Sequence, residues 1–383
     1  MARCRWHPAS ALIIAVAPAL CAATGATHDI SGQCHSLGAW QRVVSSSSCQ
    51  ASGWWDAVAA HAMPGISARG KFVFVNVGAN KGYGLAAVLQ RFGNSSVTEQ
   101  AWHARLLDFL RSKHVDEQRG HYSGVGAANP CGVCKACHDH TTALMEVPVD
   151  GTLFEISPST TQWLEDAVGH LVQRQSGSLR HRVAVVNLAV GNVSGGTVQI
   201  QTSGAFGDER GNALESSSGN QTSSRMLPRV TLDEYFAAHG MEHVDYVSVD
   251  TEGHDLLVLR GLAQALARGA VDFLEFEFSG RAHLLPGVQL KPALEAMERY
   301  GYSCWWMGGP ITAPAGNRTS AAAQRLLDSG CLTPASGLCW HDRFENPKFD
   351  HRLPFANILC ASASMASGLW ERADECRAAL GDT

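Results

Sequence analysis

The sequence predicts an α/β protein built on a mostly parallel sheet with helices on both faces. Seven short runs rich in β-branched and aromatic residues recur along the 383 residues, and segments with helical spacing of apolar residues lie between most of them. Strands that alternate with helices need crossover connections, which favour parallel pairing. The clearest pattern, FVFVNVGANKGYG (72–84), passes from a strand through a glycine turn into the start of a helix.

The expected strands follow one another with suitable lengths for a central sheet. Five are strongly patterned, at 71–77, 151–156, 183–190, 245–250 and 271–278. Two weaker runs complete the set, at 302–307 and 355–360.

Helices are expected between these strands, at 81–92, 158–172, 254–267 and 290–300. Ser157 is a natural N-cap for the second of them. Three long insertions interrupt the plan, at 93–148, 202–224 and 308–350. The first and third contain cysteines and the second is rich in Gly and Ser, so we expect them to be functional or poorly ordered.

Residues 1–26 have the pattern of an export signal. Arg3 and Arg5 precede a short apolar run at 11–23, which small residues follow. We expect a cleaved signal, with an uncleaved anchor as the alternative, then a lead-in at 27–70 and one large domain at 71–383. The protein would then reside in the lumen of the secretory pathway or outside the cell, with no membrane span after signal removal.

Cysteine usage agrees with export. The chain has 12 cysteines, and ten remain once Cys4 and Cys21 are removed with the signal, an even number as disulfides require. Four sequons favour glycosylation of an exported chain, at Asn94, Asn192, Asn220 and Asn317.

The segment CGVCKACHDH (131–140) is the most unusual part of the first insertion. Cys131, Cys134 and Cys137, with His138 and His140, have zinc-ligand residue types but lack a distant second pair. Structural disulfides are favoured in an exported chain, ahead of zinc and then of a redox-active pair.

Partners are constrained by charge. The formal net charge is -5 and no basic tract is present. A nucleic-acid binder normally carries such a tract, so we expect no nucleic-acid partner. The tryptophan pairs at 54–55 and 305–306 could stack on sugar rings, although packing in the core is the commoner role.

Ligands of open parallel sheets bind at the carboxyl ends of the strands, so the residues there are candidates. NVGANKG (76–82) follows the first strand, and its glycines allow a sharp turn beside a helix start. The spacing of Gly78 and Gly82 fits neither GxGxxG nor a P-loop. An ordinary strand-to-helix turn is the alternative.

Glu155 and Ser157 follow the second strand, where a carboxylate can accept hydrogen bonds from both hydroxyls of a ribose. Gly191 and Asn192 follow the third strand, in a turn that could border an adenine. A solvated acid and a plain turn are the alternatives for these two positions.

Ionisable residues crowd the end of the fourth strand, at Asp250, Glu252, His254 and Asp255. Acids at a helix start interact favourably with the helix dipole. That structural role explains one acid better than it explains the set.

Taken in order, these blocks resemble the FkbM family of S-adenosylmethionine-dependent methyltransferases. The matching segments are NVGANKG (76–82), FEIS (154–157), AVGN (189–192), TLDEY (231–235), VDTEGHD (249–255) and VLRG (258–261). The resemblance covers about 72–278, with the interruption at 93–148. Asn76 stands where the family usually has Asp, Ile156 and Ser157 replace a Pro, and Asp255 replaces a Glu.

The resemblance implies a Rossmann-like class I methyltransferase sheet of seven strands, the last one antiparallel. It implies S-adenosylmethionine as cofactor and a hydroxyl on a sugar, glycan or small molecule as acceptor. By position, Asp250, Glu252 and His254 would face the transferred methyl group. The cofactor-binding set would comprise Asn76, Gly78, Ala79, Asn80, Gly82, Glu155, Ser157, Gly191 and Asn192.

A neutral hydroxyl is a poor nucleophile, so a carboxylate or imidazole beside it would accept its proton. The sequence does not rank Asp250, Glu252 and His254 for this role, and no third ligand accompanies the two acids to indicate a metal ion. A non-catalytic exported binding protein on a degenerate methyltransferase fold is the first alternative, favoured by Asn76 and by the loss of Pro after Glu155. A NAD-dependent oxidoreductase is the second, disfavoured by the glycine spacing.

Overall fold

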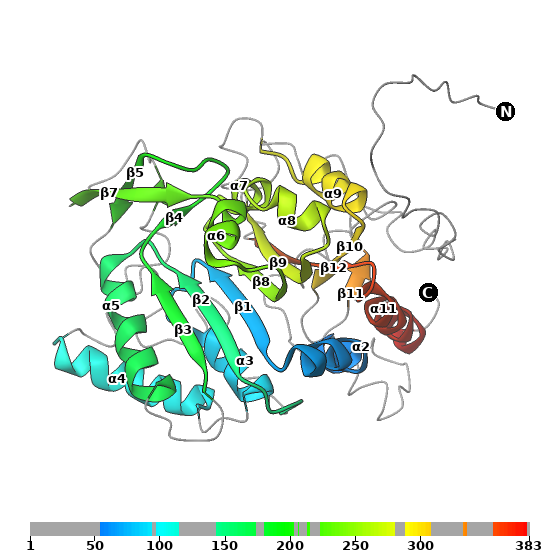
Figure 1. Ribbon diagram of the computed structural model, residues 1–383, viewed down its shortest axis with the longest axis horizontal. Coiled ribbons are helices and arrows are strands. Elements are labelled where there is room, and N and C mark those ends of the chain that lie inside the picture. The colour runs from blue at the N-terminus through cyan, green and yellow to red at the C-terminus, as the bar shows by residue number, and fades with distance from the viewer. Residues whose placement is uncertain are drawn as a thin grey trace.

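The computed structural model describes residues 54–93, 97–114, 143–173, 180–202, 206, 213–214, 223–279, 288–307, 332–334 and 355–380. Its centre is an eight-stranded sheet of order β11-β10-β12-β9-β8-β1-β2-β3 (Figure 1). The strands are β1 (Phe72–Val77), β2 (Val149–Phe154), β3 (Arg182–Val186), β8 (Val244–Val249), β9 (Val271–Ser279), β10 (Tyr302–Met307), β11 (Leu332–Pro334) and β12 (Phe355–Ser362).

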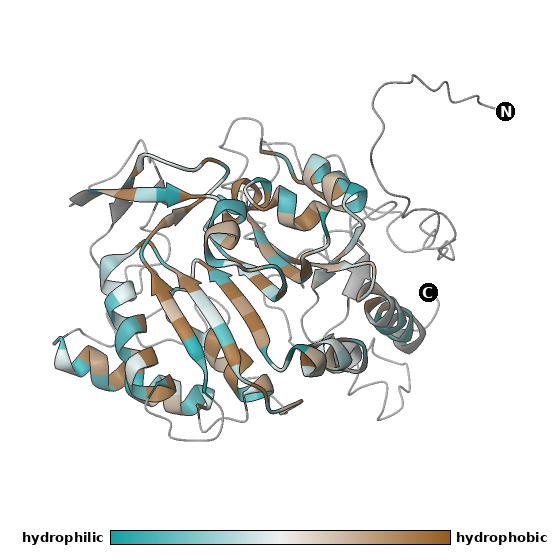
Figure 2. Ribbon diagram, viewed as in Figure 1, coloured by the Kyte–Doolittle hydropathy of each residue, from teal (hydrophilic) through white to brown (hydrophobic). Residues whose placement is uncertain are grey.

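The topology confirms the expected sheet. β1 pairs in parallel with β2 and β8, while β2 pairs with β3 and β8 with β9 in the same sense. β12 runs antiparallel between β9 and β10. The three residues of β11 extend the seven expected strands at one edge. The sheet strands are largely hydrophobic in Figure 2, as strands covered on both faces require.

Helices cover both faces of the sheet, and each face has its own hydrophobic core. One layer contains α6 (Leu232–His239), α7 (Asp255–Arg260), α8 (Ala263–Ala267) and α9 (Leu290–Arg299). The other contains α2 (Trp54–Arg69), α3 (Tyr83–Phe92), α4 (Glu99–Ser112), α5 (Pro158–Ala167) and α11 (Ala366–Leu380).

The third expected strand, at 183–190, is wrong in one respect, because the chain leaves the main sheet after Val186. The Asn187 side chain donates to the carbonyl oxygens of Glu155 and Ile156, at 2.7 and 3.2 Å, where a continuing strand would lie. The chain then enters a second sheet of order β4-β7-β5-β6. Its strands are β4 (Ala189–Val190), β5 (Thr197–Thr202), β6 (Ala213–Leu214) and β7 (Ser223–Val230).

Two expected helices also differ from the prediction. The helix at 254–267 begins at Asp255 and breaks into α7 and α8 around Gly261. A Cβ at Gly261 would lie 2.0 Å from the Gly191 carbonyl oxygen, so the break accommodates a close backbone approach. The helix at 158–172 is α-helical to Ala167 and continues as one π-helical turn, η1 (Val168–Val172).

Parts of the lead-in and of the first insertion belong to the folded core. Trp55 of α2 makes edge contacts with Phe72 and Phe92, at centroid distances of 6.0 and 5.0 Å. Trp102 of α4 is fully buried. The export signal, the lead-in before residue 54, the cysteines at 131, 134 and 137, and the sequons at 94, 220 and 317 lie outside the described residues.

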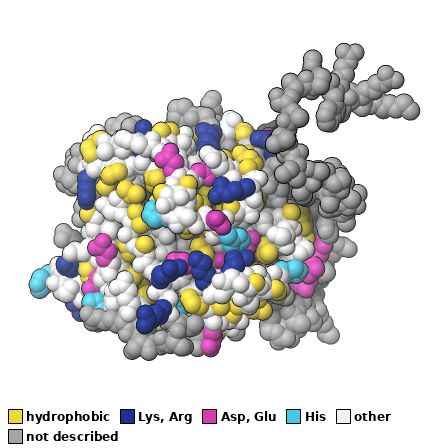
Figure 3. Space-filling view, viewed as in Figure 1, with side chains coloured by type: hydrophobic (Ala, Val, Ile, Leu, Met, Phe, Trp, Pro, Cys, Tyr) yellow, Lys and Arg dark blue, Asp and Glu magenta, His cyan; other side chains and the backbone are white. Residues whose placement is uncertain are grey.

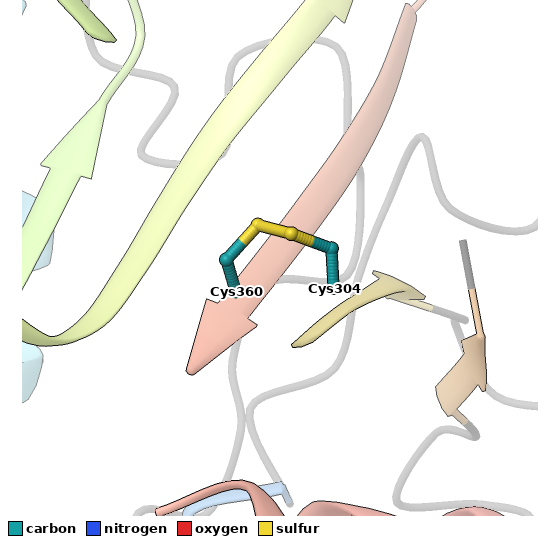
Figure 4. The surroundings of a disulfide bond; sticks show 2 residues. All are labelled: Cys304 and Cys360. Atoms are coloured by element: carbon teal, nitrogen blue, oxygen red, sulfur yellow. A yellow bond between two sulfur atoms is a disulfide. The ribbon is translucent and has the colours of Figure 1, made fainter. Parts of the chain in front are cut away.

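A disulfide joins Cys304 of β10 to Cys360 of β12, which are directly opposite in the ladder (Figure 4). Both cysteines are buried. The sequence gives no signal for this pairing, because it depends on strand register. Trp305 and Trp306 beside it are fully buried, so packing in the core is confirmed for this pair.

Within the described part of the chain, no helix has both the length and the apolar character needed to cross a membrane. Basic, acidic and histidine side chains are interspersed on the face viewed in Figure 3.

Candidate active site

The turn after β1 brings the first and fourth sequence blocks into contact. Gly78 and Gly82 have φ values of 80° and 81°, in the left-handed region that favours glycine. A Cβ at Gly78 would lie 1.7 Å from the Asp250 carbonyl oxygen. The Asp250 amide in turn donates to the Val77 carbonyl at 2.9 Å. Gly78 is therefore required by geometry, whatever ligand the turn contacts.

The amide groups of this turn are satisfied inside the protein. Gly78 and Ala79 both donate to the Phe154 carbonyl at 3.0 Å, and Gly82 donates to Ala79 at 2.8 Å. The Asn80 amide donates to Glu155 Oε2 at 2.8 Å. A pyrophosphate-binding turn presents such amides to its ligand. This arrangement favours a ligand without phosphates over a dinucleotide.

Glu155 lies at the end of β2 with its carboxylate held in place. Its Oε1 accepts from the Ser157 amide at 2.8 Å while its Oε2 accepts from Asn80. Burial raises the pKa of Glu155, and the backbone hydrogen bonds oppose that shift. Each carboxylate oxygen has a further lone pair that a ribose hydroxyl could use. The two carboxylate oxygens can therefore accept hydrogen bonds from a pair of ribose hydroxyls.

Ser157 supports this carboxylate and starts a helix. Its amide binds Glu155, and its hydroxyl accepts from the Thr160 amide at 3.4 Å as the N-cap of α5. Both Ser157 and Glu155 are buried. Ser157 therefore positions Glu155. This role is additional to the cofactor contact that the sequence predicts for Ser157.

Two tryptophans that the sequence did not single out anchor the turn. The indole N–H groups of Trp102 and Trp163 donate to the Lys81 carbonyl at 2.8 and 2.9 Å. A Cβ at Gly82 would meet Trp102 and Leu164 at 2.7 Å, so close packing also requires this glycine. Trp102 lies inside the first insertion, and only its helical apolar spacing signals burial.

The acids after β8 divide into a structural group and a candidate catalytic group. Asp255 is buried and accepts from the Thr251 hydroxyl at 3.0 Å and the Gly253 amide at 3.2 Å. Burial raises the pKa of Asp255 to about 6. Asp255 therefore shapes the turn, whereas Asp250 and Glu252 are the acids that the sequence predicts for chemistry. Asp250 is exposed and Glu252 is half-buried with φ 55°.

His254 immediately precedes α7 and is half-buried. Burial lowers its pKa, and a hydrogen bond with the Thr251 backbone opposes that shift. A neutral imidazole keeps one nitrogen able to accept a proton.

The remaining predicted residues occupy three different environments. Asn76 is buried on β1 and donates to the Ser248 carbonyl at 3.4 Å. Gly191 donates to Val230 at 3.1 Å and packs against Gly261, while Asn192 is exposed.

The contacts of the turn after β1 join Gly78, Asn80, Glu155 and Asp250 into one constellation. No described contact links Gly191 or Asn192 to it.

Comparison with known families agrees with this geometry. A family model described as the methyltransferase FkbM domain matches residues 76–304, from the end of β1 into β10. No curated protein matches the chain.

Proposed function

The chain belongs to the FkbM methyltransferase family, and on that premise we propose that it transfers a methyl group from S-adenosylmethionine to a hydroxyl oxygen. The observation that carries the cofactor assignment is the Glu155 carboxylate, fixed by the Asn80 and Ser157 amides beside the glycine turn. The acceptor would be a sugar, a glycan or a small molecule.

The cofactor would supply an activated methyl group, so this chain has to position two molecules and accept a proton. Held beside the glycine turn and Glu155, the cofactor would supply the methyl group to the acceptor oxygen, and the electron pair of the broken methyl–sulfur bond would remain on S-adenosylhomocysteine. The acceptor hydroxyl would lose its proton to a nearby base. Asp250, Glu252 and the neutral His254 are the candidates at this edge of the sheet.

The two alternatives are weakened by different observations. A nicotinamide dinucleotide needs amide donors for its pyrophosphate, and four amides of the turn are already used internally. A degenerate, non-catalytic site was favoured by Asn76. However, the Asn76 side chain donates to the Ser248 carbonyl. This structural role accounts for Asn at this position without requiring that the site be inactive.

We also propose that the protein works in the secretory lumen or outside the cell. The buried disulfide between Cys304 and Cys360 supports an oxidising compartment, as does the N-terminal signal pattern. Such a location requires that the methyl donor be delivered there.

A screen with labelled methyl donor would test the proposal. The purified protein is incubated with the donor and a panel of glycans and hydroxylated metabolites, and label transfer and S-adenosylhomocysteine release are measured. Transfer that disappears in Glu155→Gln would support an O-methyltransferase. Donor binding without transfer to any hydroxyl would favour the non-catalytic alternative.

A further inference from the structure

Of the four glycosylation sequons, the structure describes one, in the turn between β4 and β5. It comprises Asn192, Val193 and Ser194. Asn192 is exposed, and Val193 beside it is 45% exposed. Among the described residues, the hydrogen bonds of this turn come from its neighbours and not from the Asn192 side chain. The side-chain amide that a glycan needs is therefore accessible.

Backbone contacts fix this turn to the second sheet. Gly191 donates to the Val230 carbonyl at 3.1 Å, and Gly195 donates to the Arg229 carbonyl at 3.2 Å. The Arg229 side chain returns a hydrogen bond from Nε to the Gly195 carbonyl at 2.8 Å. Asn192 is thus presented from a turn of defined shape.

Open space adjoins the turn. A Cβ at Gly191, Gly195 or Gly196 would have no contact within 4 Å among the described residues. The strands β5 and β7 lie at the periphery of the molecule (Figure 1). A surface turn of this kind has room for a bulky glycan.

The same region exposes apolar side chains. Val193 in the turn is 45% exposed, and Met226 of β7 is 54% exposed. A glycan is bulky and strongly hydrated, so one attached to Asn192 would shield Val193, its neighbour in the chain. Modification of this sequon therefore has a physical benefit for solubility.

The third residue of the sequon is already engaged in the folded protein. Ser194 Oγ accepts from the Thr231 amide at 2.7 Å and donates to Thr231 Oγ1 at 3.1 Å. Thr231 is in turn the N-cap of α6, where it accepts from the Glu234 amide at 3.2 Å. Glycosylation requires the Ser or Thr of a sequon as well as its Asn. This hydroxyl is therefore available only before Thr231 docks.

We propose that Asn192 carries an N-linked glycan, attached while residues 192–194 are still unfolded. The Asn192 side-chain nitrogen bonds to the anomeric carbon of a lipid-linked oligosaccharide and loses one proton. The bond from that carbon to the phosphate oxygen breaks, and its electron pair leaves with the lipid diphosphate. An amide that bears a glycan is not expected to contact the cofactor, the role that the sequence predicts for Asn192. This inference rests on the proposed export of the chain and is independent of methyl transfer.

The experiment uses the full chain, secreted from a eukaryotic host with its own N-terminal segment. Enzymatic release of N-glycans in heavy-oxygen water leaves a labelled aspartate at each occupied asparagine, and peptide mass spectrometry measures the label at position 192. We expect label in most secreted copies. Asn192→Gln should remove it, whereas Ser194→Thr, which keeps both the sequon and the hydroxyl, should retain it.

The order of events is tested with a purified oligosaccharyltransferase and a lipid-linked oligosaccharide. One acceptor is the folded chain made without glycans, and the other is the same chain unfolded by reduction and alkylation of its cysteines. Circular dichroism checks both states. Transfer to Asn192 should be at least about tenfold slower in the folded chain, because two hydrogen bonds of Ser194 must open first.

The inference is overturned if the secreted chain carries no glycan at Asn192, or if the folded and unfolded chains accept the glycan at equal rates. Failure of the proposed export has a different signature. In that case the chain stays inside the host cells with residues 1–26 attached, which overturns both the export and the glycan.

Discussion

The α-carbon of Gly78 lies so close to the Asp250 carbonyl oxygen that a side chain there would overlap the backbone, with a Cβ 1.7 Å from that oxygen. This contact joins the loop after β1 to the loop after β8. Backbone contact therefore fixes the proposed methyl-donor region relative to the proposed methyl-acceptor region.

Gly78→Ala should destabilise the protein by about 3 kcal/mol or more, because both the overlap and the positive φ oppose a side chain. Gly191→Ala is the matched control, since nothing lies within 4 Å of a Cβ there. Denaturant unfolding measures both variants. Similar stability of the two would contradict the close approach.

Glu155→Gln should weaken S-adenosylmethionine binding at least tenfold, because a carboxylate oxygen is lost as an acceptor for the ribose. Calorimetry measures the affinity, and Glu165→Gln, an exposed acid on α5, is the control. Equal affinity in Glu155→Gln and the control would remove Glu155 from the cofactor site.

Asp250→Asn and Glu252→Gln separate chemistry from binding. If either carboxylate takes the proton of the methyl-acceptor hydroxyl, replacing that carboxylate should lower turnover about 100-fold or more. The affinity for S-adenosylmethionine should change less than about threefold. Single-turnover methyl transfer and calorimetry give the two numbers, with exposed Glu242→Gln as control. Parallel losses of donor affinity would instead place these acids at the cofactor.

A cluster of charged side chains lies at the opposite edge of the sheet, where the parallel strands begin. Arg69 of α2 donates to Asp245, and the Val73 amide donates to the same carboxylate at 2.6 Å. His243 Nε2 lies 3.2 Å from Asp272 Oδ2. His243, Asp245 and Asp272 have metal-ligand residue types, but Arg69 already supplies the positive charge there.

The pKa of His243 is raised to about 9, first by its hydrogen bond with Asp245, then by Asp272, against the opposing effect of burial. A raised histidine pKa stabilises the fold fully below the unfolded value of about 6.5. That stabilisation, at most about 3 kcal/mol, is lost as pH rises through 9. His243→Gln should remove the alkaline decline, measured by unfolding between pH 6 and 10. An unchanged decline in the variant would assign it to another group.

The sheet could be predicted from the sequence because its strands are largely apolar runs, most clearly in 72–77 and less clearly in 302–307. The break after Val186 could not, because it depends on Asn187 reaching carbonyl groups of a neighbouring strand. The second sheet was also missed, since β5 and β7 are rich in polar residues and their pairing depends on the tertiary fold.

The candidate site was predictable in part, because ligands of parallel sheets bind at the carboxyl ends of the strands. Glycine and acidic residues at strand ends identified Gly78, Glu155 and Asp250. Their hydrogen bonds and the anchoring of the turn by Trp102 and Trp163 needed the structure.

Calorimetry with S-adenosylmethionine, S-adenosylhomocysteine and NAD tests the central claim most directly. The account predicts that the protein binds the first two and does not bind NAD. Failure to bind either sulfur compound, or binding of NAD instead, would contradict it.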